Sequence, residues 1–390
     1  MTVHYIWLSW SSLYLRALGA TPEMVGIFSL VQEAPRMLAQ FPGGLLADRF
    51  GRKKLIVYCT AAQIVAPLSF LFANTWQQLI PGIIFDDVVW GLYSPARQAL
   101  IAESLPYQKR GTAFGVFRTI TSIPRIFLPI LSGILMDQVG VIEGVRIGFI
   151  LMILGHVVMT AARGLLLRET LSIKNEEAKH TSLRDSVSGL AGLRGSVLAM
   201  LIVAIVSSFL VRMTQPFLVV YAVEIAKLTK TQWGAIQTII GAISTILAFP
   251  SGVISDRFGR RLPILLARFL LPFNRLILLL TRGFNEILLL HILVGIGTGL
   301  GGEAMGSSGA MGGPAWNALL ADLISSKDRG KITGLMSMIT GLTSMPSSII
   351  GGYVWTSFSP GFLLSSTFLA GMVPVLILYI FVKEPKKREK

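Results

Sequence analysis

Long apolar segments alternate with short polar ones along the whole chain of 390 residues. Each apolar segment approaches the ~20 residues that a helix needs to cross ~30 Å of hydrocarbon, and the segments recur too often for the first to be a removable signal ahead of a soluble domain. The pattern therefore predicts a multi-pass membrane protein made of helices. The twelve expected helices are 1–18, 21–47, 53–74, 77–103, 110–138, 142–166, 194–223, 230–255, 261–281, 284–320, 329–356 and 360–382.

The first expected helix is the most polar of the twelve. Residues 1–18 barely span a bilayer and hold His4, three serines and Arg16. We expect this helix to face a polar interior and the natural chain to carry residues upstream of it.

Composition and charge support a membrane location. The chain is 53% hydrophobic and 14% charged, with a formal net charge of +15. The basic residues gather in alternate loops, which by the positive-inside rule places both termini in the cytoplasm. Because they are divided among short loops and form no single basic face, nucleic-acid binding is excluded. The basic loops lie at 49–54, 109–110, 168–194, 257–261, 327–331 and 383–390.

The sequence offers little for catalysis or metal binding. Cys59 is the only cysteine, so no disulfide forms within the chain, and the four histidines lack the spacing of zinc ligands. No phosphate-binding Gly-rich loop with Lys and Ser or Thr is present, so ATP hydrolysis has no visible site. We expect no cofactor, no metal and no enzymatic activity.

A short signature occurs twice, each time between two apolar segments. It reads GLLADRFGRK from Gly44 and GVISDRFGRR from Gly252. A second pair of matching stretches begins at Pro95 and Pro314. The chain is therefore a duplication. We expect an N-terminal bundle at 1–168, a cytoplasmic linker at 169–193, a C-terminal bundle at 194–383 and a basic cytoplasmic tail at 384–390.

The doubled signature, placed between the second and third helices of each half, resembles that of the major facilitator superfamily of secondary transporters. The resemblance implies an all-α membrane protein with twelve transmembrane helices in two pseudo-symmetric six-helix bundles. It also implies a central cavity that opens alternately to each side as the bundles rock.

The signature residues are candidates for a conformational latch. The resemblance implies that Asp48 meets the N-terminus of the eleventh helix near Gly330, and by symmetry that Asp256 meets the fifth helix near Gly111. Such contacts form only when the cytoplasmic side is closed, and a helix N-terminus favours a carboxylate. The alternative is that these charges only set topology and shape a tight turn. The latch candidates are Gly44, Asp48, Arg49, Gly51, Arg52, Glu103, Gly252, Asp256, Arg257, Gly259, Arg260 and Asp322, with Arg52–Glu103 and Arg260–Asp322 as expected charge pairs.

Ionisable residues inside the apolar segments form the second candidate set. Each costs at least ~2.5–3.5 kcal/mol to insert unless it faces a partner or a polar cavity, so such residues are functional suspects. Glu33 and Arg36 are three apart on one helix face and can pair directly. The substrate and coupling candidates are Glu33, Arg36, Asp86, Asp87, Arg118, Arg125, Arg212, Arg275, His291 and Glu303.

Asp87 lies four residues before Gly91, where many members of the resembled family have an arginine. This departure makes Arg36, Arg118 or Arg125 the candidate substitute. A carboxylate without water holds its proton until a cation approaches, so Glu33 or Asp87 can exchange a proton for substrate. The alternative is a static ion pair, Glu33 with Arg36 or Asp87 with Arg118, that holds helices together.

We therefore expect a monomeric secondary transporter in the cytoplasmic membrane, coupled to an ion that is expected to be H⁺. Its substrate is a small organic molecule, with drug or metabolite efflux favoured because Pro129 and Gly133 match part of the Gly- and Pro-rich segment of exporters. Two alternatives stay open. One is an importer of an anionic metabolite held by arginines. The other is a non-transporting receptor or lipid-handling protein on the same scaffold.

Overall fold

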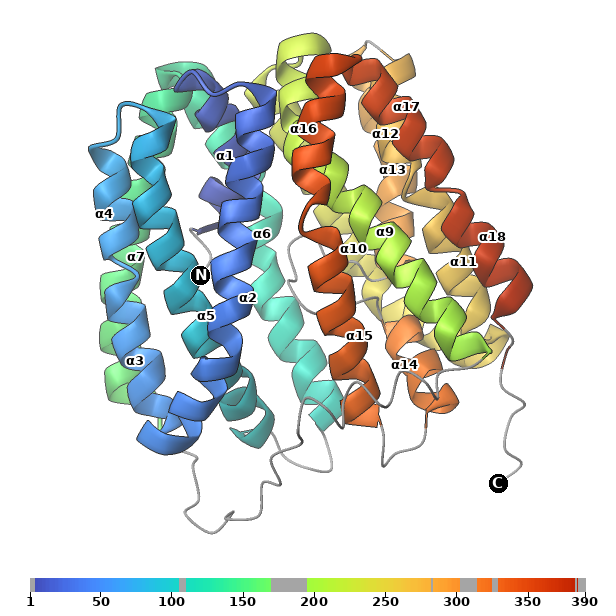
Figure 1. Cartoon of the computed structure of the whole chain (residues 1–390), viewed down its shortest axis with the longest axis horizontal. Coiled ribbons are helices and arrows are strands. Elements are labelled where there is room, and N and C mark those ends of the chain that lie inside the picture. Colours follow the sequence, from blue (N-terminus) through green and yellow to red (C-terminus); the bar gives the residue numbers. More distant parts are fainter. Residues whose placement is uncertain are drawn as a thin grey trace. The chain divides into compact units, whose positions relative to one another are not determined.

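The computed structural model describes residues 4–104, 110–169, 195–281, 283–301, 314–324, 329–382 and 384. The described residues form helices and connecting turns, without a strand (Figure 1). The chain divides into two compact units. The first comprises Met1–Ala178 and Thr229–Gly234, and the second Lys179–Leu228 and Ala235–Lys390. The expected linker 169–193 and tail 384–390 lie outside the described residues, except for Glu169 and Glu384.

The first unit occupies the first six expected ranges with helices. Two of those ranges hold more than one element, because the third helix is interrupted and the fourth begins with a short 3₁₀ turn. The elements are α1 (His4–Ala17), α2 (Pro22–Phe50), α3 (Arg52–Ala62), α4 (Val65–Leu71), η1 (Trp76–Gln78), α5 (Leu79–Ser104), α6 (Arg110–Val139) and α7 (Val141–Leu166).

The second unit fills the remaining six ranges, except for the start of the helix expected at 230–255, which is assigned to the first unit. The expected single helix 284–320 is described as two helices, and 302–313 between them lie outside the described residues. The elements are α9 (Ser196–Val220) with a π-turn η4 (Tyr221–Ile225), α10 (Lys230–Phe258), α11 (Arg261–Leu270), α12 (Phe273–Leu280), α13 (Phe284–Gly301), α14 (Pro314–Leu323), α15 (Arg329–Ser344), α16 (Ser347–Ser357), α17 (Pro360–Ala370) and α18 (Val373–Phe381).

Proline explains why several expected helices are interrupted. A proline has no N–H, so the carbonyl four residues before it loses its helical hydrogen bond. Pro67 follows the break after α3, Pro272 and Pro346 lie in the breaks before α12 and α16, and Pro374 follows the break after α17. Each of these expected helices is described as two shorter elements, and Arg52–Leu71, Arg261–Leu280 and Pro360–Phe381 are each still long enough to span a membrane. In a membrane, neighbouring helices and hydroxyl side chains compensate for such breaks.

The most extensive helix contact within the described residues joins α2 and α5, which lie side by side in the first unit (Figure 1). A methyl group built on Gly43 of α2 would overlap the backbone of Leu92 on α5. One built on Gly91 of α5 would lie 2.5 Å from the carbonyl oxygen of Arg36. The two backbones therefore touch at positions where only glycine fits, as is common between membrane helices.

A group of aromatic side chains packs together in the first unit. Trp7 of α1 is 2% exposed and packs on Phe70 and Phe149, with ring centroids 5.5 Å away in each case. The indole N–H of Trp10 donates to the Ser132 hydroxyl at 2.7 Å. These rings belong to the helical packing of their own unit.

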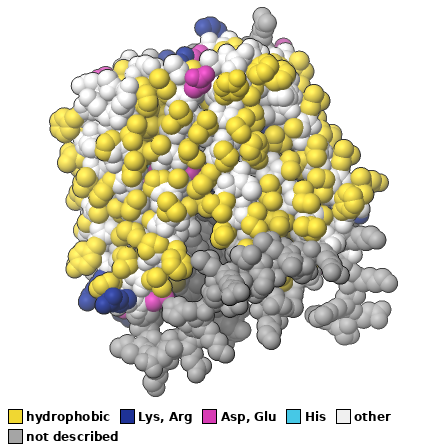
Figure 2. Space-filling model, in the orientation of Figure 1, with side chains coloured by type: hydrophobic (Ala, Val, Ile, Leu, Met, Phe, Trp, Pro, Cys, Tyr) yellow, Lys and Arg dark blue, Asp and Glu magenta, His cyan; other side chains and the backbone are white. Residues whose placement is uncertain are grey.

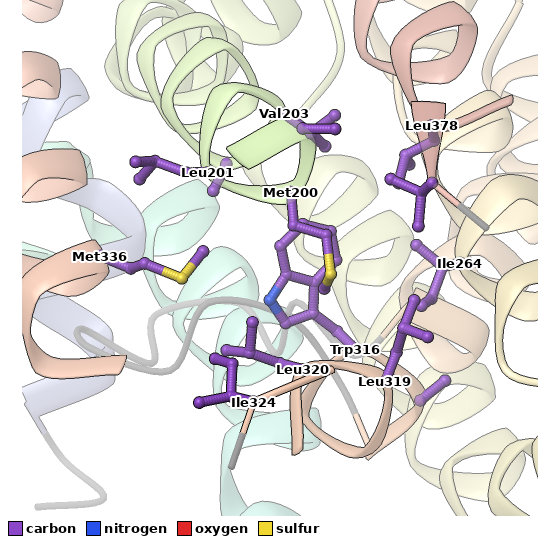
Figure 3. Close-up of a cluster of buried hydrophobic side chains, with 14 residues drawn as sticks. Met200, Leu201, Val203, Ile264, Trp316, Leu319, Leu320, Ile324, Met336 and Leu378 are labelled. Atoms are coloured by element: carbon purple, nitrogen blue, oxygen red, sulfur yellow. The ribbon is translucent and has the colours of Figure 1, made fainter. Parts of the chain in front are cut away.

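The core of the second unit is built around Trp316. In Figure 3 its indole lies beneath Met200, with Leu319 and Leu320 from its own helix beside it. Ile264 and Leu378 close the other side of the cluster. The Arg268 guanidinium lies over the indole, 5.3 Å from the ring centroid. Trp316 is 1% exposed and so has a structural role in its unit.

The surface suits a bilayer. Leu165, Phe72 and Tyr58 are more than two-thirds exposed, at 84%, 75% and 71%. Among the described residues, seven helical segments are long and apolar enough to cross a membrane. Figure 2 shows hydrophobic side chains over most of the described face in view. Such an apolar surface is stable against lipid and unstable against water.

The glycine contact between α2 and α5 yields the first prediction. Gly43→Ala forces the helices apart and lowers the free energy of unfolding by about 1–3 kcal/mol. The measurement is the thermal unfolding midpoint of the purified protein in detergent.

The adjacent Gly44→Ala is the matched control. A methyl group on Gly44 meets no atom within 4 Å, so alanine there adds helix propensity worth up to about 1 kcal/mol. An equal loss of stability in both variants would contradict the close contact at Gly43.

Candidate functional site

A cluster of buried charges lies where α2 and α5 touch in the first unit. Arg36 donates from Nη2 to the Glu33 carboxylate one turn earlier on α2. Its Nε lies 3.9 Å from Oδ1 of Asp87 on α5. Asp87 is 8% exposed, so this aspartate is buried within the spanning bundle. The Arg36 guanidinium thus lies between two carboxylates, which we name the Arg36 cluster.

Asp86 has a different partner from its neighbour. Successive helical residues point about 100° apart, so Asp86 turns toward α3 while Asp87 turns toward α2. Gln63 donates from Nε2 to Oδ1 of Asp86 at 3.4 Å, and both residues are buried. Three carboxylates therefore gather near the Arg36 guanidinium in the part of the chain that the structure describes. This arrangement carries an excess of negative charge when all of them are ionised.

An aromatic pair lies beside the Arg36 cluster. The rings of His4 on α1 and Trp90 on α5 stack at a centroid distance of 5.9 Å with 19° between their planes. Trp90 is three residues after Asp87 and so shares its helix face. Sequence reasoning placed His4 among the scattered histidines. Only the approach of α1 to α5 in the fold reveals it as a neighbour of the charges.

The second unit holds a separate polar group. Arg275 of α12 donates from Nε to the Thr214 hydroxyl at 3.0 Å and from Nη2 to the Leu210 carbonyl at 3.2 Å. His291 of α13 lies with Nδ1 2.7 Å from the Ile287 carbonyl and Nε2 3.0 Å from Oδ1 of Asn274. His291 is 0% exposed.

The remaining inner candidates are less fully described. Arg125 of α6 and Arg212 of α9 are half-buried. The side chain of Arg118 and the whole of Glu303 lie outside the described residues, so the expected Asp87–Arg118 pair stays a prediction. The guanidinium that the structure places beside Asp87 is that of Arg36.

The two signatures form the same turn in each unit. Gly51 has φ 89° and Gly259 has φ 92°, a left-handed conformation that glycine adopts without strain. Glu169 accepts hydrogen bonds from the backbone N–H groups of Arg52 and Lys53 at 3.1 and 3.0 Å.

Glu384 repeats this contact in the second unit. It accepts from the N–H groups of Arg260 and Arg261 at 2.6 and 2.9 Å. A carboxylate thus caps the N-termini of both α3 and α11, where it also meets the positive end of the helix dipole. Sequence reasoning missed both glutamates. The signal was present, since each follows the last helix of its half.

The latch candidates differ in what surrounds them. Arg260 forms an ion pair with Asp322 and donates to the Ala318 carbonyl. Asp48 and Arg49 are exposed at the end of α2. Gly44 and Gly252 lie within α2 and α10. The side chains of Glu103, Asp256 and Arg257 lie outside the described residues, so the Arg52–Glu103 pair and the contacts of Asp48 and Asp256 with distant helices stay predictions.

Family comparison agrees with this architecture. The family model described as Major Facilitator Superfamily matches residues 1–308. The chain belongs to the Major Facilitator Superfamily. Among solved superfamily structures, the nucleoside transporter NupG has a TM-score of 0.77 at 12% identity, covering 98% of this chain and 96% of that one. The likeness confirms the fold.

Full-length superfamily relatives are distant in sequence. An uncharacterized MFS-type transporter of Methanocaldococcus jannaschii is 22% identical over 357 residues, which cover 85% of this chain and 91% of the relative. A multi-drug resistance efflux pump PmrA homolog of Lactococcus lactis is 23% identical over 389 residues, which cover 96% and 90%. This superfamily member is therefore a multi-pass membrane transporter.

Charge balance in the Arg36 cluster is open to test. Arg36→Gln leaves Glu33 and Asp87 without their cation and should lower the free energy of unfolding by about 1–3 kcal/mol. Adding Asp87→Asn removes one stranded charge and should restore part of the loss. Thermal unfolding of the single and double variants measures this. A double variant as unstable as the sum of the single variants would contradict the interaction.

The glutamate caps give a second prediction for this site. Glu384→Ala takes both acceptors from the N-terminus of α11 and should cost about 0.5–2 kcal/mol of stability. Glu169→Ala should cost a similar amount at α3, because its geometry is the same. Glu384→Gln keeps one acceptor oxygen and should lose less. Unchanged thermal midpoints for both alanine variants would show that these contacts do not hold the turns.

Proposed function

We propose that this protein is a secondary active transporter that exports a small organic cation across the cytoplasmic membrane in exchange for protons, by alternating access. The family supports transport, and its efflux-named relative supports the direction. The positive-inside pattern supports a cytoplasmic location for both termini.

One observation carries the choice of a cation. Glu33, Asp86 and Asp87 bring three carboxylates to one region of the first unit, and the guanidinium that the described contacts place among them is that of Arg36. Excess acid inside a membrane protein is stable only when protons or a cationic guest neutralise it. Protons and an organic cation can therefore replace one another at this place, which is the requirement for exchange. The stacked rings of His4 and Trp90 provide a flat aromatic surface beside the charges.

The anion importer has less support. That function needs arginines whose donors are available to a carboxylate or phosphate. Arg36 already serves Glu33 and lies near Asp87, and Arg275 already donates to Thr214 and Leu210. An anion would have to displace these internal partners.

The signature turns fit a latch role in this transport cycle. Their glycines and glutamate caps give each unit a rigid turn that presents its charges at one end of the bundle.

We keep the proposal that Asp48 and Asp256 stabilise the state closed to the cytoplasm. Asp48→Asn should then alter the labelling of a single cysteine introduced on the cytoplasmic side of a Cys59→Ser protein, while the exposed Lys54→Gln should not.

Transport in vesicles tests the function. Purified protein reconstituted in liposomes should move ethidium, a flat organic cation, against its gradient when a pH gradient of the proper sign is imposed. It should not move glycerol 3-phosphate. Asp87→Asn should reduce ethidium movement at least ten-fold, whereas Glu143→Gln, which alters an exposed pair with Arg146, should not.

Two results would contradict this proposal. Accumulation of glycerol 3-phosphate with loss on Arg36→Gln would establish the anion importer. No flux of either probe, or of other organic cations such as tetraphenylphosphonium, would favour the non-transporting receptor.

A further inference from the structure

The adjacent carboxylates of Asp86 and Asp87 on α5 have partners of different charge. Asp87 lies beside a permanent cation, with Arg36 Nε at 3.9 Å from its Oδ1. Asp86 lies beside a neutral amide, with Gln63 Nε2 at 3.4 Å. Asp87 is 8% exposed and Asp86 is 5% exposed, so little bulk water reaches either carboxylate to weaken the effect of its partner. The nature of the partner decides which charge states each carboxylate can adopt.

An arginine side chain can only donate hydrogen bonds, whereas a glutamine amide both donates and accepts. The 3.9 Å Asp87–Arg36 ion pair therefore favours the ionised form of Asp87, because the O–H of a protonated Asp87 finds no acceptor on Arg36. The Asp86–Gln63 pair is satisfied in both states. The amide nitrogen donates to the carboxylate, and after rotation the amide oxygen accepts from the protonated carboxyl. Asp86 can gain or lose a proton without leaving a buried polar group unpaired.

Gln63 itself lies at a helix break. It follows the last residue of α3, Ala62, and α4 begins at Val65. Pro67 cannot donate to the Gln63 carbonyl, so this carbonyl is an additional acceptor near the middle of the span Arg52–Leu71. Irregular backbone at membrane depth persists where it is buried in protein or lines a polar route. The break thus provides polar groups next to Asp86 that a regular helix would not.

Asp86 differs from Glu33 and Asp87 because the partner described for it, Gln63, is a neutral side chain. On α2, Glu33 and Arg36 are paired with each other. On α5, Tyr93 lies two turns after Asp86, with the Arg163 guanidinium of α7 5.7 Å from its ring centroid. The titratable or charged side chains around this part of α5 include Glu33 and Arg36 of α2, Cys59 of α3, Asp87, Tyr93 and Arg97 of α5, His4 of α1, and His156 and Arg163 of α7.

We propose that Asp86, held by Gln63, is a proton-binding site separate from the Arg36 cluster, and that Asp87 stays ionised beside Arg36. The proton that Asp86 binds comes from water on one side of the membrane and is returned to water on the other. The inference rests on the proposed proton-coupled transport, in which it assigns the coupling proton to one carboxylate.

Infrared difference spectroscopy tests this assignment without any transported solute. Wild-type protein in lipid vesicles, taken from alkaline to acidic pH, should gain a carboxyl C=O band from a buried protonated acid. Asp86→Asn should lose that band. Asp87→Asn should keep it. Gln63→Met leaves the carboxyl and removes its partner, so the band should remain and shift in frequency.

The outcomes separate the two proposals. A band that survives in Asp86→Asn, or that disappears in Asp87→Asn with Asp86 intact, would overturn the proton site. A band that is lost only with Asp86, in a protein that moves no ethidium under a pH gradient, would sustain the proton site and reject the transport proposal. If Asp86→Asn does not fold, Asp86→Glu replaces it, and an unshifted band in that variant contradicts the assignment.

Discussion

The close approach of α2 and α5 is the contact on which the polar interior of the first unit depends. Because Gly43 and Gly91 have no side chains, the two backbones touch. Arg36 of one helix then reaches Asp87 of the other. A larger residue at either glycine would separate the charges and leave each in an apolar surrounding. The glycines that let the helices pack closely thus also let the buried charges pair, which lowers the free-energy cost of burying them.

Local spacing was enough to predict part of this site. Glu33 and Arg36 are one helical turn apart, and they form the ion pair that this spacing allows. The duplicated signature indicated two related turns, and both share the left-handed glycine. Pairs between residues on different helices could not be predicted from the sequence. The sequence around Gln63 does not predict Asp86 as its hydrogen-bond partner, because that contact depends on how α3 packs against α5.

Helix interruptions show the same limit. Hydropathy predicted twelve apolar stretches, and the described helices overlap these ranges. It did not predict the breaks, since a proline within an apolar run changes hydrogen bonding without changing hydropathy. Pro67 was visible in the sequence. Its effect on Gln63, and so on Asp86, becomes apparent only when the two helices are placed together.

Comparison of the two halves shows what duplication preserved. Each half keeps a glycine turn whose following helix is capped by a glutamate after the last helix of that half. The inner positions diverged. His291 occupies the place before Gly295 that Asp87 occupies before Gly91, and it contacts Asn274 rather than an arginine. Within the described residues, the repeated scaffold therefore carries buried aspartates in its first half, and a buried histidine with the buried arginines Arg268 and Arg275 in its second.

The central claim is that the acidic interior trades protons for an organic cation. It is tested most directly by adding ethidium to purified protein in weakly buffered detergent solution and recording pH with an indicator dye. The account predicts that protons are released in proportion to bound ethidium, and that the triple variant Glu33→Gln, Asp86→Asn, Asp87→Asn releases none. Ethidium binding with no proton release from the wild-type protein would contradict it.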